Sequence, residues 1–426
     1  MKILLLGSGG REHALAKKIS ESPLCSGLFC APGNPGTALV AQNIPLSISN
    51  FEEIATFCNK EHISMIVVGP EDPLVAGIYD YFKNNDALKH IQVVGPSQQA
   101  AQLEGSKAFA KAFMKRHHIP TAAYAEFNVA NYEAGCAYIK EHALPIVLKA
   151  DGLAAGKGVV IAQTHQEALD TFKAMLHDKQ FGDAGNTVVI EQFLNGIECS
   201  MFVLTDGQHY VMLPHAKDYK RIGEGDTGLN TGGMGAVSPV PFVDDVFTQK
   251  VIQQIIEPTV NGLSQEGLVY QGFIFFGLIK VDNEPWVIEY NCRMGDPETE
   301  VVMPRLKSDL VALLQTLPSQ TLHTQSCEHH PEAAATVMLV SAGYPGAYPK
   351  GLPIQGATNS KDVYIYHAGT AMQHDALVTN GGRVMALTAM APSLNEALQH
   401  AKQKAETIQF DGKYFRRDIG WEFVDA

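Results

Sequence analysis

Short apolar runs alternate with helical stretches over the first hundred residues. KILLLG, SMIVVGP and IQVVGP have the length and composition of strands, and REHALAKKIS and FEEIATFCNK lie between such runs. This alternation predicts a parallel sheet with helices on its faces. Ligands of such sheets gather at the carboxyl ends of the strands, where this chain carries GSGGRE, PGNPG and GPEDP. We therefore expect Gly10, Arg11, Asn34 and Glu71 to converge on one crevice.

The pattern changes after the first hundred residues. A helix is predicted from Ser97 to His118, ended by Ile119–Pro120, and residues 121–190 form a small unit of strands and helices around IVLKA and GVVIA. From 191 to about 315 the runs are longer and mostly β, which indicates an antiparallel sheet. Residues 327–426 carry further strands and a helix from Leu394 to Ile408, which predicts a small α/β cap.

Length and charge restrict the class of protein. The 426 residues suffice for about three domains, and 46% apolar with 18% charged residues is ordinary for a soluble globular protein. A formal net charge of −13 argues against nucleic acid as a partner. Seven cysteines without a C-x-x-C pair fit a reducing cytoplasm, and we see neither a signal peptide nor a membrane-spanning run.

The opening string LLLGSGGREHALA lies where a dinucleotide site would lie, between a strand and a helix. Gly7 and Gly9 fill the first two positions of G-x-G-x-x-G, but the third is Glu12. The expected second strand, around 28–31, is not followed by an acidic residue that would bind a ribose hydroxyl. A nicotinamide cofactor is therefore disfavoured, and a tight turn alone remains the alternative.

The string KADGLAAGKGVVIA, residues 149–162, is a glycine-rich loop between two strands. It lacks the spacing and the hydroxyl residue of a P-loop, and a strand follows it instead of a helix. We expect a hairpin loop that closes over phosphates through its backbone N–H groups, with Lys149 and Lys157 supplying charge. The alternative is a surface turn that is rich in glycine for its backbone angles.

Strand alternation in EPWVIEYNCRMGDPETE predicts that Glu289, Asn291 and Arg293 share one face. A carboxylate beside an amide oxygen suits Mg²⁺ that bridges nucleotide phosphates, and Arg293 would stabilise charge on a transferring phosphoryl group. A solvated face with an ordinary ion pair is the alternative. Further upstream, residues 218–239 are too rich in Gly and Thr for a strand or helix. We expect an active-site loop there, headed by Asp218, Lys220 and Arg221.

Nine strings in series resemble the phosphoribosylamine–glycine ligase family of the ATP-grasp superfamily. They are KILLLGSGGREHALA, PGNPGT, GPEDPLVAGI, GSKAFAKAF, KADGLAAGKGV, EQFLNGIECS, DTGLNTGGMGAVSP, EYNCRMGDPETE and YFRRDIG. The resemblance implies a multidomain α/β and α+β protein with an ATP-grasp fold. Its expected parts are a Rossmann-like domain over 1–103, a central ATP-grasp domain over 104–120 and 191–326, a lid over 121–190 and a C-terminal domain over 327–426. It also implies ATP-dependent ligation of glycine to 5-phosphoribosylamine through a glycyl phosphate, with Mg²⁺ or Mn²⁺, in a cytoplasmic monomer.

Site residues follow from the resemblance position by position. The ATP-binding set is Lys107, Lys149, Gly156, Lys157, Gly158, Glu191, Phe193, Leu194 and Glu198, with the mobile flap over 151–158. The metal ligands are Glu289 and Asn291, and the catalytic set is Arg293, Asp218 and Asp296. Phosphoribosylamine and glycine are assigned to Gly10, Arg11, Asn34, Glu71, Pro297, Arg416 and Arg417, with Arg416 or Arg417 binding the phosphate.

Three departures from the family pattern stand out. Lys217 and Tyr219 replace the glutamine and histidine of Q-D-H-K-R, and Glu300 ends GDPETE where GDPETQ is usual. The strand IFFGLI before Glu289 offers no second acidic metal ligand. Another ATP-grasp enzyme of purine synthesis, or a nucleotide-binding regulator without catalysis, are the competing hypotheses, and only an enzyme requires Glu289, Asn291 and Arg293 together.

Overall fold

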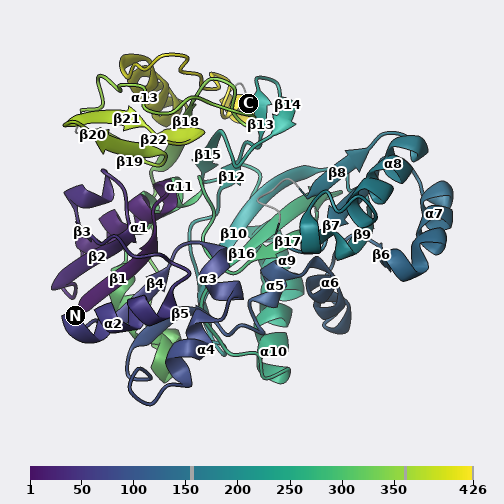
Figure 1. Cartoon of the computed structure of the whole chain (residues 1–426), viewed down its shortest axis with the longest axis horizontal. Helices are drawn as coiled ribbons and strands as arrows, with labels where there is room; N and C mark the ends of the chain where they lie inside the picture. Colours follow the sequence, from purple (N-terminus) through teal and green to yellow (C-terminus); the bar gives the residue numbers. More distant parts are fainter. Residues whose placement is uncertain (154–157, 359–361, 425–426) are drawn as a thin grey trace.

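A computed structural model describes residues 1–153, 158–358 and 362–424 of the chain. Its N-terminal part is a parallel sheet in the order β3-β2-β1-β4-β5, which confirms the prediction from the alternating pattern (Figure 1). The strands are β1 (Lys2–Gly7), β2 (Gly27–Pro32), β3 (Gln42–Asn43), β4 (Met65–Val68) and β5 (Gln92–Pro96). The helices of this part are α1 (Gly10–Ser20), α2 (Phe51–Glu61), α3 (Glu71–Val75) and α4 (Ile78–Lys83).

The helix expected from Ser97 to His118 is divided in two. The structure has α5 (Gln102–Gly105) and α6 (Lys107–Arg116), separated by Ser106 in an extended conformation. The Ser106 side chain accepts a hydrogen bond from the backbone N–H of Phe109, which is the usual N-cap arrangement. Because α6 begins again after this cap, Lys107 becomes its first residue.

An antiparallel sheet continues the parallel one. Its strands are β10 (Ile197–Thr205), β11 (Tyr210–Met212), β16 (Tyr270–Val281) and β17 (Glu284–Asn291). The start of β16 pairs with the end of β5, and this pairing produces one nine-stranded sheet.

The expectation that residues 191–315 are mostly β was wrong for two segments. Residues 299–315 contain two short helices, and residues 245–265 are helical, as α9 (Asp245–Val251), a π-helical turn (Ile252–Ile256) and α10 (Glu257–Gln265). Phe247, Val251 and Ile255 recur every fourth residue and are buried on one side of these helices. This helical spacing outweighs the strand preference of the β-branched residues.

The unit expected over residues 121–190 has a sheet and a core of its own. Its strand order is β6-β9-β7-β8, with β6 (Tyr124–Asn128), β7 (Ile146–Ala150), β8 (Val159–Ala162) and β9 (Thr187–Gln192). Helices α7 (Tyr132–Glu141) and α8 (His165–Leu176) pack on it, and Phe127, Ile139 and Phe172 lie in the shared core. The antiparallel pairing of β7 with β8 confirms the predicted hairpin.

Residues 218–239 contain short strands, contrary to the expectation of an irregular loop. They are β12 (Lys217–Asp218), β13 (Arg221–Gly223), β14 (Thr227–Asn230) and β15 (Gly235–Ser238). Backbone pairing explains them, because β12 and β15 are held by the C-terminal sheet in the order β12-β15-β18-β22-β19. That sheet adds β18 (Ala333–Val340), β19 (Val363–His367) and β22 (Arg383–Ala391), and β20 (Thr370–Gln373) pairs with β21 (Ala376–Thr379).

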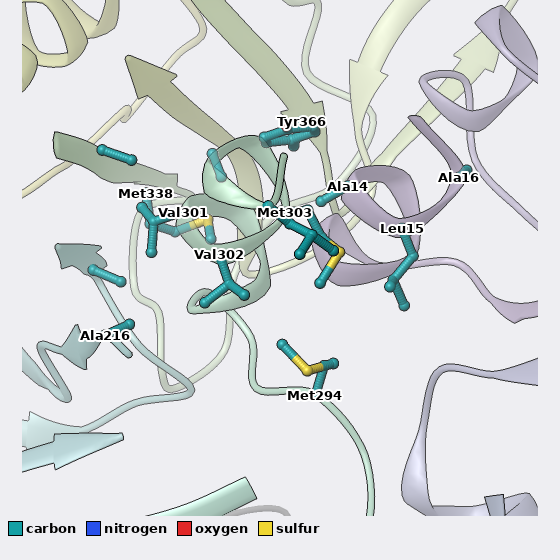
Figure 2. Close-up of a cluster of buried hydrophobic side chains, with 14 of the residues drawn as sticks. Ala14, Leu15, Ala16, Ala216, Met294, Val301, Val302, Met303, Met338 and Tyr366 are labelled. Carbon is teal, nitrogen blue, oxygen red and sulfur yellow. The ribbon is translucent and has the colours of Figure 1, made fainter. Parts of the chain in front are cut away.

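The first and last parts of the chain share a core with the centre. Figure 2 shows Leu15 of α1, Met303 of α11 (Thr299–Arg305) and Tyr366 of β19 in one buried cluster. Helices α12 (Leu310–Gln315), α13 (Leu394–Thr407) and α14 (Trp421–Val424) follow. The helix and strands expected at the C-terminal end are confirmed. Among the described residues, no helix has the length and apolar character needed to cross a membrane.

Candidate active site

Two lysines and a glutamate form a buried cluster where the lid sheet meets the central sheet. Glu191 of β9 lies 3.0 Å from the ammonium nitrogens of both Lys149 on β7 and Lys111 on α6. Burial lowers the pKa of Lys111 to about 8, although Glu191 opposes the shift. Lys149 also donates a hydrogen bond to the backbone carbonyl of Ile288, 3.2 Å away, so it joins the lid to β17. Lys111, which the sequence analysis did not select, is the fourth residue after Lys107 on the same helix.

Lys107, at the start of α6, spans the beginning of the glycine-rich loop. Its ammonium group donates to the carbonyl oxygen of Gly152 at 3.0 Å. Burial lowers the pKa of Lys107, and the carboxylate of Glu289 opposes this shift. Lys107 and Glu289 therefore lie close enough to influence each other, although α6 and β17 are far apart in the sequence.

The hairpin that carries the predicted flap is described only in part. Gly158 accepts a hydrogen bond from the backbone N–H of Ala150 and leads into β8. Gly156 and Lys157 lie outside the described residues. The side chains of Phe193 and Leu194 follow β9 in the half-buried connection to β10, between the lid and the central sheet.

Glu289 and Asn291 stand two residues apart on β17, as strand alternation predicts. Gly277 of β16 faces Glu289, and a Cβ there would lie only 3.1 Å from Cγ of Glu289, so the glycine makes room for the carboxylate. Asn291 is buried, and among the described residues its amide nitrogen has no hydrogen-bond partner. The carboxylate of Glu289 and the amide oxygen of Asn291 are oxygen ligands of the kind that Mg²⁺ or Mn²⁺ takes, together with phosphates and water.

No group of three or more His, Cys, Asp and Glu side chains in the described part of the chain is arranged to hold a metal. A metal at Glu289 and Asn291 would therefore need phosphate oxygens to complete its coordination.

Asp218 and Lys220 meet Glu198 beside these residues. Lys220 lies 2.6 Å from a carboxylate oxygen of Glu198 and 3.8 Å from one of Asp218. Against the effect of burial, the charges of Asp218, Glu198 and Glu289 raise the pKa of Lys220 well above its ordinary value. Burial raises the pKa of Asp218, and Lys220 opposes that shift. Residues predicted separately from three motifs thus form one charged group.

The prediction for Arg293 was wrong in one respect. Strand β17 ends at Asn291, so alternation does not extend to Arg293. Its guanidinium instead lies 3.1 Å from Glu71 of α3 and 2.7 Å from Glu104 of α5. Glu104 is a residue that the sequence analysis missed, and burial raises its pKa while Arg293 opposes the shift.

Arg11 and Glu71 gather at the end of the parallel sheet, as expected. Arg11 donates hydrogen bonds to Glu12 at 2.6 Å and to the carbonyl oxygen of Met294 at 3.3 Å. The charges of Arg293 and Glu71 also act on the pKa of its guanidinium group. The side chains of Arg11, Glu71 and Arg293 therefore lie close together at the predicted edge of the sheet.

Asn34 lies at the same edge, but its side chain is used by the protein. Its amide nitrogen donates to the carbonyls of Ser8 and His367, both at 2.8 Å, and its oxygen accepts from the N–H groups of Gly36 and Thr37. The structure therefore gives Asn34 the role of holding the PGNPG loop, and not the substrate contact predicted for it.

Glu12 explains why the opening loop departs from a dinucleotide motif. Its carboxylate accepts the N–H of Gly9 at 2.6 Å. The side chain packs on Gly7 and Gly69, where an added Cβ would lie 2.5 and 2.1 Å from Glu12 atoms. The carboxylate thus occupies a backbone donor that a dinucleotide phosphate would need, which counts against a nicotinamide cofactor.

The turn after β17 packs against the glycine-rich segment before β15. Pro297 lies on Gly233, whose φ of 118° and close contact both require glycine. Asp296 forms an ion pair with Arg383 of β22 at 3.0 Å. Arg383 is another residue that was missed, because its partners lie about 87 and 151 residues away along the chain.

Two buried glutamates of the same turn also escaped the sequence analysis. Glu298 accepts a hydrogen bond from Ser200 at 3.1 Å, and burial beside Asp218 raises its pKa to about 7. Glu300 is completely buried, and neither of its carboxylate oxygens has a hydrogen-bond partner in the described part of the chain. It lies against Gly10, where a Cβ would come within 2.4 Å of a Glu300 oxygen. The GDPE string of the sequence contains Glu298 and could have indicated it, whereas Glu300 differed from the family pattern only at the last position of GDPETQ.

The two arginines assigned to phosphate binding have other partners. Arg416 is fully buried and pairs with Asp226 at 2.6 Å and Asp418 at 2.7 Å, so the structure contradicts its predicted role. Arg417 is exposed and pairs with Glu406 on α13 at 3.0 Å. The contacts of both arginines lie in the C-terminal part and the β13–β14 turn, away from the end of β1.

Three models of protein families match the chain in order. They are described as phosphoribosylglycinamide synthetase N domain over residues 1–104, ATP-grasp (A) domain over 105–299 and C domain over 334–422. Curated relatives include the phosphoribosylamine–glycine ligases of Vibrio cholerae, 46% identical over 432 residues, and Pasteurella multocida, 46% identical over 428 residues. Each alignment covers 100% of this chain, and 99% and 98% of the respective relative.

Solved structures agree with these matches. A phosphoribosylamine–glycine ligase from Thermotoga maritima superposes with a TM-score of 0.85 at 34% identity, covering 98% of this chain and 100% of that one. A biotin carboxylase–ATP complex from Campylobacter jejuni gives a TM-score of 0.73 at 16% identity, covering 100% of this chain and 95% of the other. The second likeness shows the fold alone, and the ATP-grasp fold expected from the sequence is confirmed.

Proposed function

The chain belongs to the phosphoribosylglycinamide synthetase family and is an ATP-dependent phosphoribosylamine–glycine ligase, and we propose how its residues divide this reaction. ATP phosphorylates the glycine carboxylate, and the amine of 5-phosphoribosylamine attacks the glycyl phosphate. The products are glycinamide ribonucleotide, ADP and phosphate, in the second step of de novo purine synthesis. An acyl phosphate requires charge neutralisation, alignment and exclusion of water, and no nucleophilic side chain.

The ATP phosphates are assigned to the space between the lid and β17. Lys107, Lys149 and Glu289 surround it from three elements, and the hydrogen bond from Lys149 to the backbone of β17 is the observation that carries this assignment. The two ammonium groups would neutralise phosphate charge. A Mg²⁺ or Mn²⁺ held by Glu289 and Asn291 would polarise the transferring phosphoryl group.

Adenosine is assigned to the connection between lid and central sheet. Phe193 and Leu194 supply half-buried apolar side chains there, directly after the strand that carries Glu191. Glu198 on β10 would accept hydrogen bonds from the ribose hydroxyls. Lys220 pairs with one carboxylate oxygen of Glu198, so the sugar would bind the other oxygen or displace Lys220.

Glycine and the attacking amine are assigned to the acidic turn. Asp218, Asp296, Pro297 and Glu298 line the region between β12 and α11. Glu298, with its pKa raised to about 7 by burial, is suited to accept the proton that the amine loses on attack. Arg293, held between Glu71 and Glu104, presents a fixed positive charge beside this region.

Phosphoribosylamine is assigned to the end of the parallel sheet, through Gly10, Arg11 and Glu71. Arg11→Ala should then raise the KM for phosphoribosylamine by about tenfold or more and leave the KM for ATP nearly unchanged, because one charged hydrogen bond is lost. Steady-state ADP release, with each substrate varied in turn, measures both constants. The opposite pattern would assign the opening loop to the nucleotide.

ADP release is the test of the function as a whole. We expect release only when glycine and phosphoribosylamine are both present, with Mg²⁺ or Mn²⁺, and its loss on chelation. Release with bicarbonate and without glycine would indicate another member of the superfamily.

We further propose that the protein is cytoplasmic, because all seven cysteines are free, as in a reducing compartment. We also propose that it is a monomer, and sedimentation would measure the mass of the particle in solution.

A further inference from the structure

The C-terminal segment 416–422 contacts the active-site segment 217–226 along its whole length. Figure 1 shows the end of the described chain, in yellow, beside β13 and β14. Asp418 accepts the N–H of Gly225 at 2.7 Å, and Arg416 donates to the carbonyl of Arg221 at 3.1 Å and pairs with Asp226. Residues separated by about 190 positions in the sequence are therefore joined by polar contacts, which range from exposed to partly buried.

One carboxylate provides the contact nearest the active site. Glu422 of α14 accepts a hydrogen bond from the Tyr219 hydroxyl at 2.8 Å through one oxygen and lies 3.2 Å from the Lys217 ammonium through the other. The Lys217 ammonium lies 4.2 Å from the centre of the Tyr219 ring, and the Arg416 guanidinium lies 5.4 Å from it. Tyr219 is thus held between two cations, and its hydroxyl is fixed by the tail.

The other side of the same backbone faces the reaction. Successive side chains of an extended segment point to opposite sides, so Lys217 and Tyr219 alternate with Asp218 and Lys220. Backbone hydrogen bonds between Tyr219 and the β15 side keep this segment extended. Lys220 pairs with Glu198 and lies 3.8 Å from Asp218, and the charge of Glu289 acts on both Asp218 and Lys220, whereas Lys217 and Tyr219 contact Glu422.

We propose that the C-terminal segment positions Asp218 and Lys220, with Glu422 acting through Lys217 and Tyr219 as positioning residues. This inference rests on the proposed function, because its readout is ligase turnover. It also accounts for two departures from Q-D-H-K-R, since Lys217 and Tyr219 are matched to Glu422. A displacement of about 1 Å in a site residue can cost about 100-fold in rate, so a loosened strand would impair turnover without removing any group that touches substrate.

The test compares Glu422→Gln, Tyr219→Phe and their combination with Asp411→Asn. Asp411→Asn is the matched control, because it also removes one negative charge, at an exposed position of the same C-terminal part. We expect each single variant to lower kcat by about 10- to 100-fold, with the KM for ATP changed less than about twofold. The double variant should be no slower than the slower single variant, because both changes loosen the attachment of the same segment to Glu422. Asp411→Asn should match the wild type.

Three outcomes would overturn the inference. They are an unchanged kcat in folded Glu422→Gln and Tyr219→Phe enzymes, multiplicative losses in the double variant, or losses confined to the KM for ATP. If Glu422→Gln does not fold, Tyr219→Phe, which removes a single oxygen atom, decides the question. A wild-type enzyme without glycine-dependent ADP release would instead contradict the proposed function, so the two failures are distinguishable.

Discussion

Replacing Glu191 with glutamine should destabilise the protein by about 3–5 kcal/mol, because it removes one charge from a buried group of three. Glu191 is 3.0 Å from both Lys111 and Lys149, and all three side chains are almost completely buried. At an effective dielectric constant of about 20, each such contact is worth about 5 kcal/mol before the cost of desolvation is subtracted. Glutamine has a similar shape but leaves two ammonium groups without a counter-charge.

Denaturant unfolding at neutral pH measures this effect. The matched control is Glu406→Gln, which breaks a pair of the same 3.0 Å length with Arg417 at the surface, where the two side chains are 55% and 61% exposed. Solvent screening limits that loss to about 1 kcal/mol or less. A loss from Glu191→Gln that does not exceed the control would refute the reasoning.

The pH dependence of the Glu191→Gln effect provides a second check. The pKa of Lys111 is lowered to about 8 even with Glu191 present, and the loss of the carboxylate lowers it further. Lys111 then becomes neutral in the folded variant as the pH rises toward 9, which relieves the repulsion between the two lysines. The difference in unfolding free energy between wild type and variant should therefore shrink between pH 7 and 9. A difference that grows over this range would contradict the assignment.

Three further predictions concern other buried groups. Glu289→Gln should lower turnover by about 100-fold or more and weaken Mg²⁺-dependent ATP binding. The control Glu284→Gln, at the exposed start of the same strand, should change neither. Equal rates of ADP release from the two variants would contradict the metal site. Burial raises the pKa of Glu300, so the folded state keeps a proton that the unfolded state loses above about pH 4.3. Glu300→Gln should therefore increase the free energy of unfolding, and the increase should be larger at pH 7 than at pH 5. Thermal unfolding at the two pH values measures it. Burial lowers the pKa of His13 to about 3 and of His367 to about 4. The free energy of unfolding should therefore fall as the pH drops below about 6.5, by about 1.4 kcal/mol per pH unit for each histidine. In acid unfolding, the free energy of His13→Gln should depend less steeply on pH than that of the wild type.

Local pattern was sufficient for much of the fold. The apolar runs from KILLLG to IQVVGP predicted the parallel sheet, and the glycine-rich string between Lys149 and Val159 predicted a hairpin. These features depend on side-chain periodicity and on backbone freedom at glycine, which are properties of neighbouring residues. The same holds for Glu289 and Asn291, since residues two positions apart on one strand point to the same side. The order of nine motifs also sufficed for the family.

Partners distant in the sequence were beyond such reasoning. Arg293 is bound by Glu71, 222 positions away, and Arg416 by Asp226, 190 positions away, so neither is free in the way that its motif suggested. The division of 97–118 at Ser106 and the strands within 218–239 likewise depend on contacts with Asp151 and with the C-terminal sheet. A buried charge must be neutralised where the folded chain places it, and periodicity along the chain does not specify which distant residue will be its neighbour.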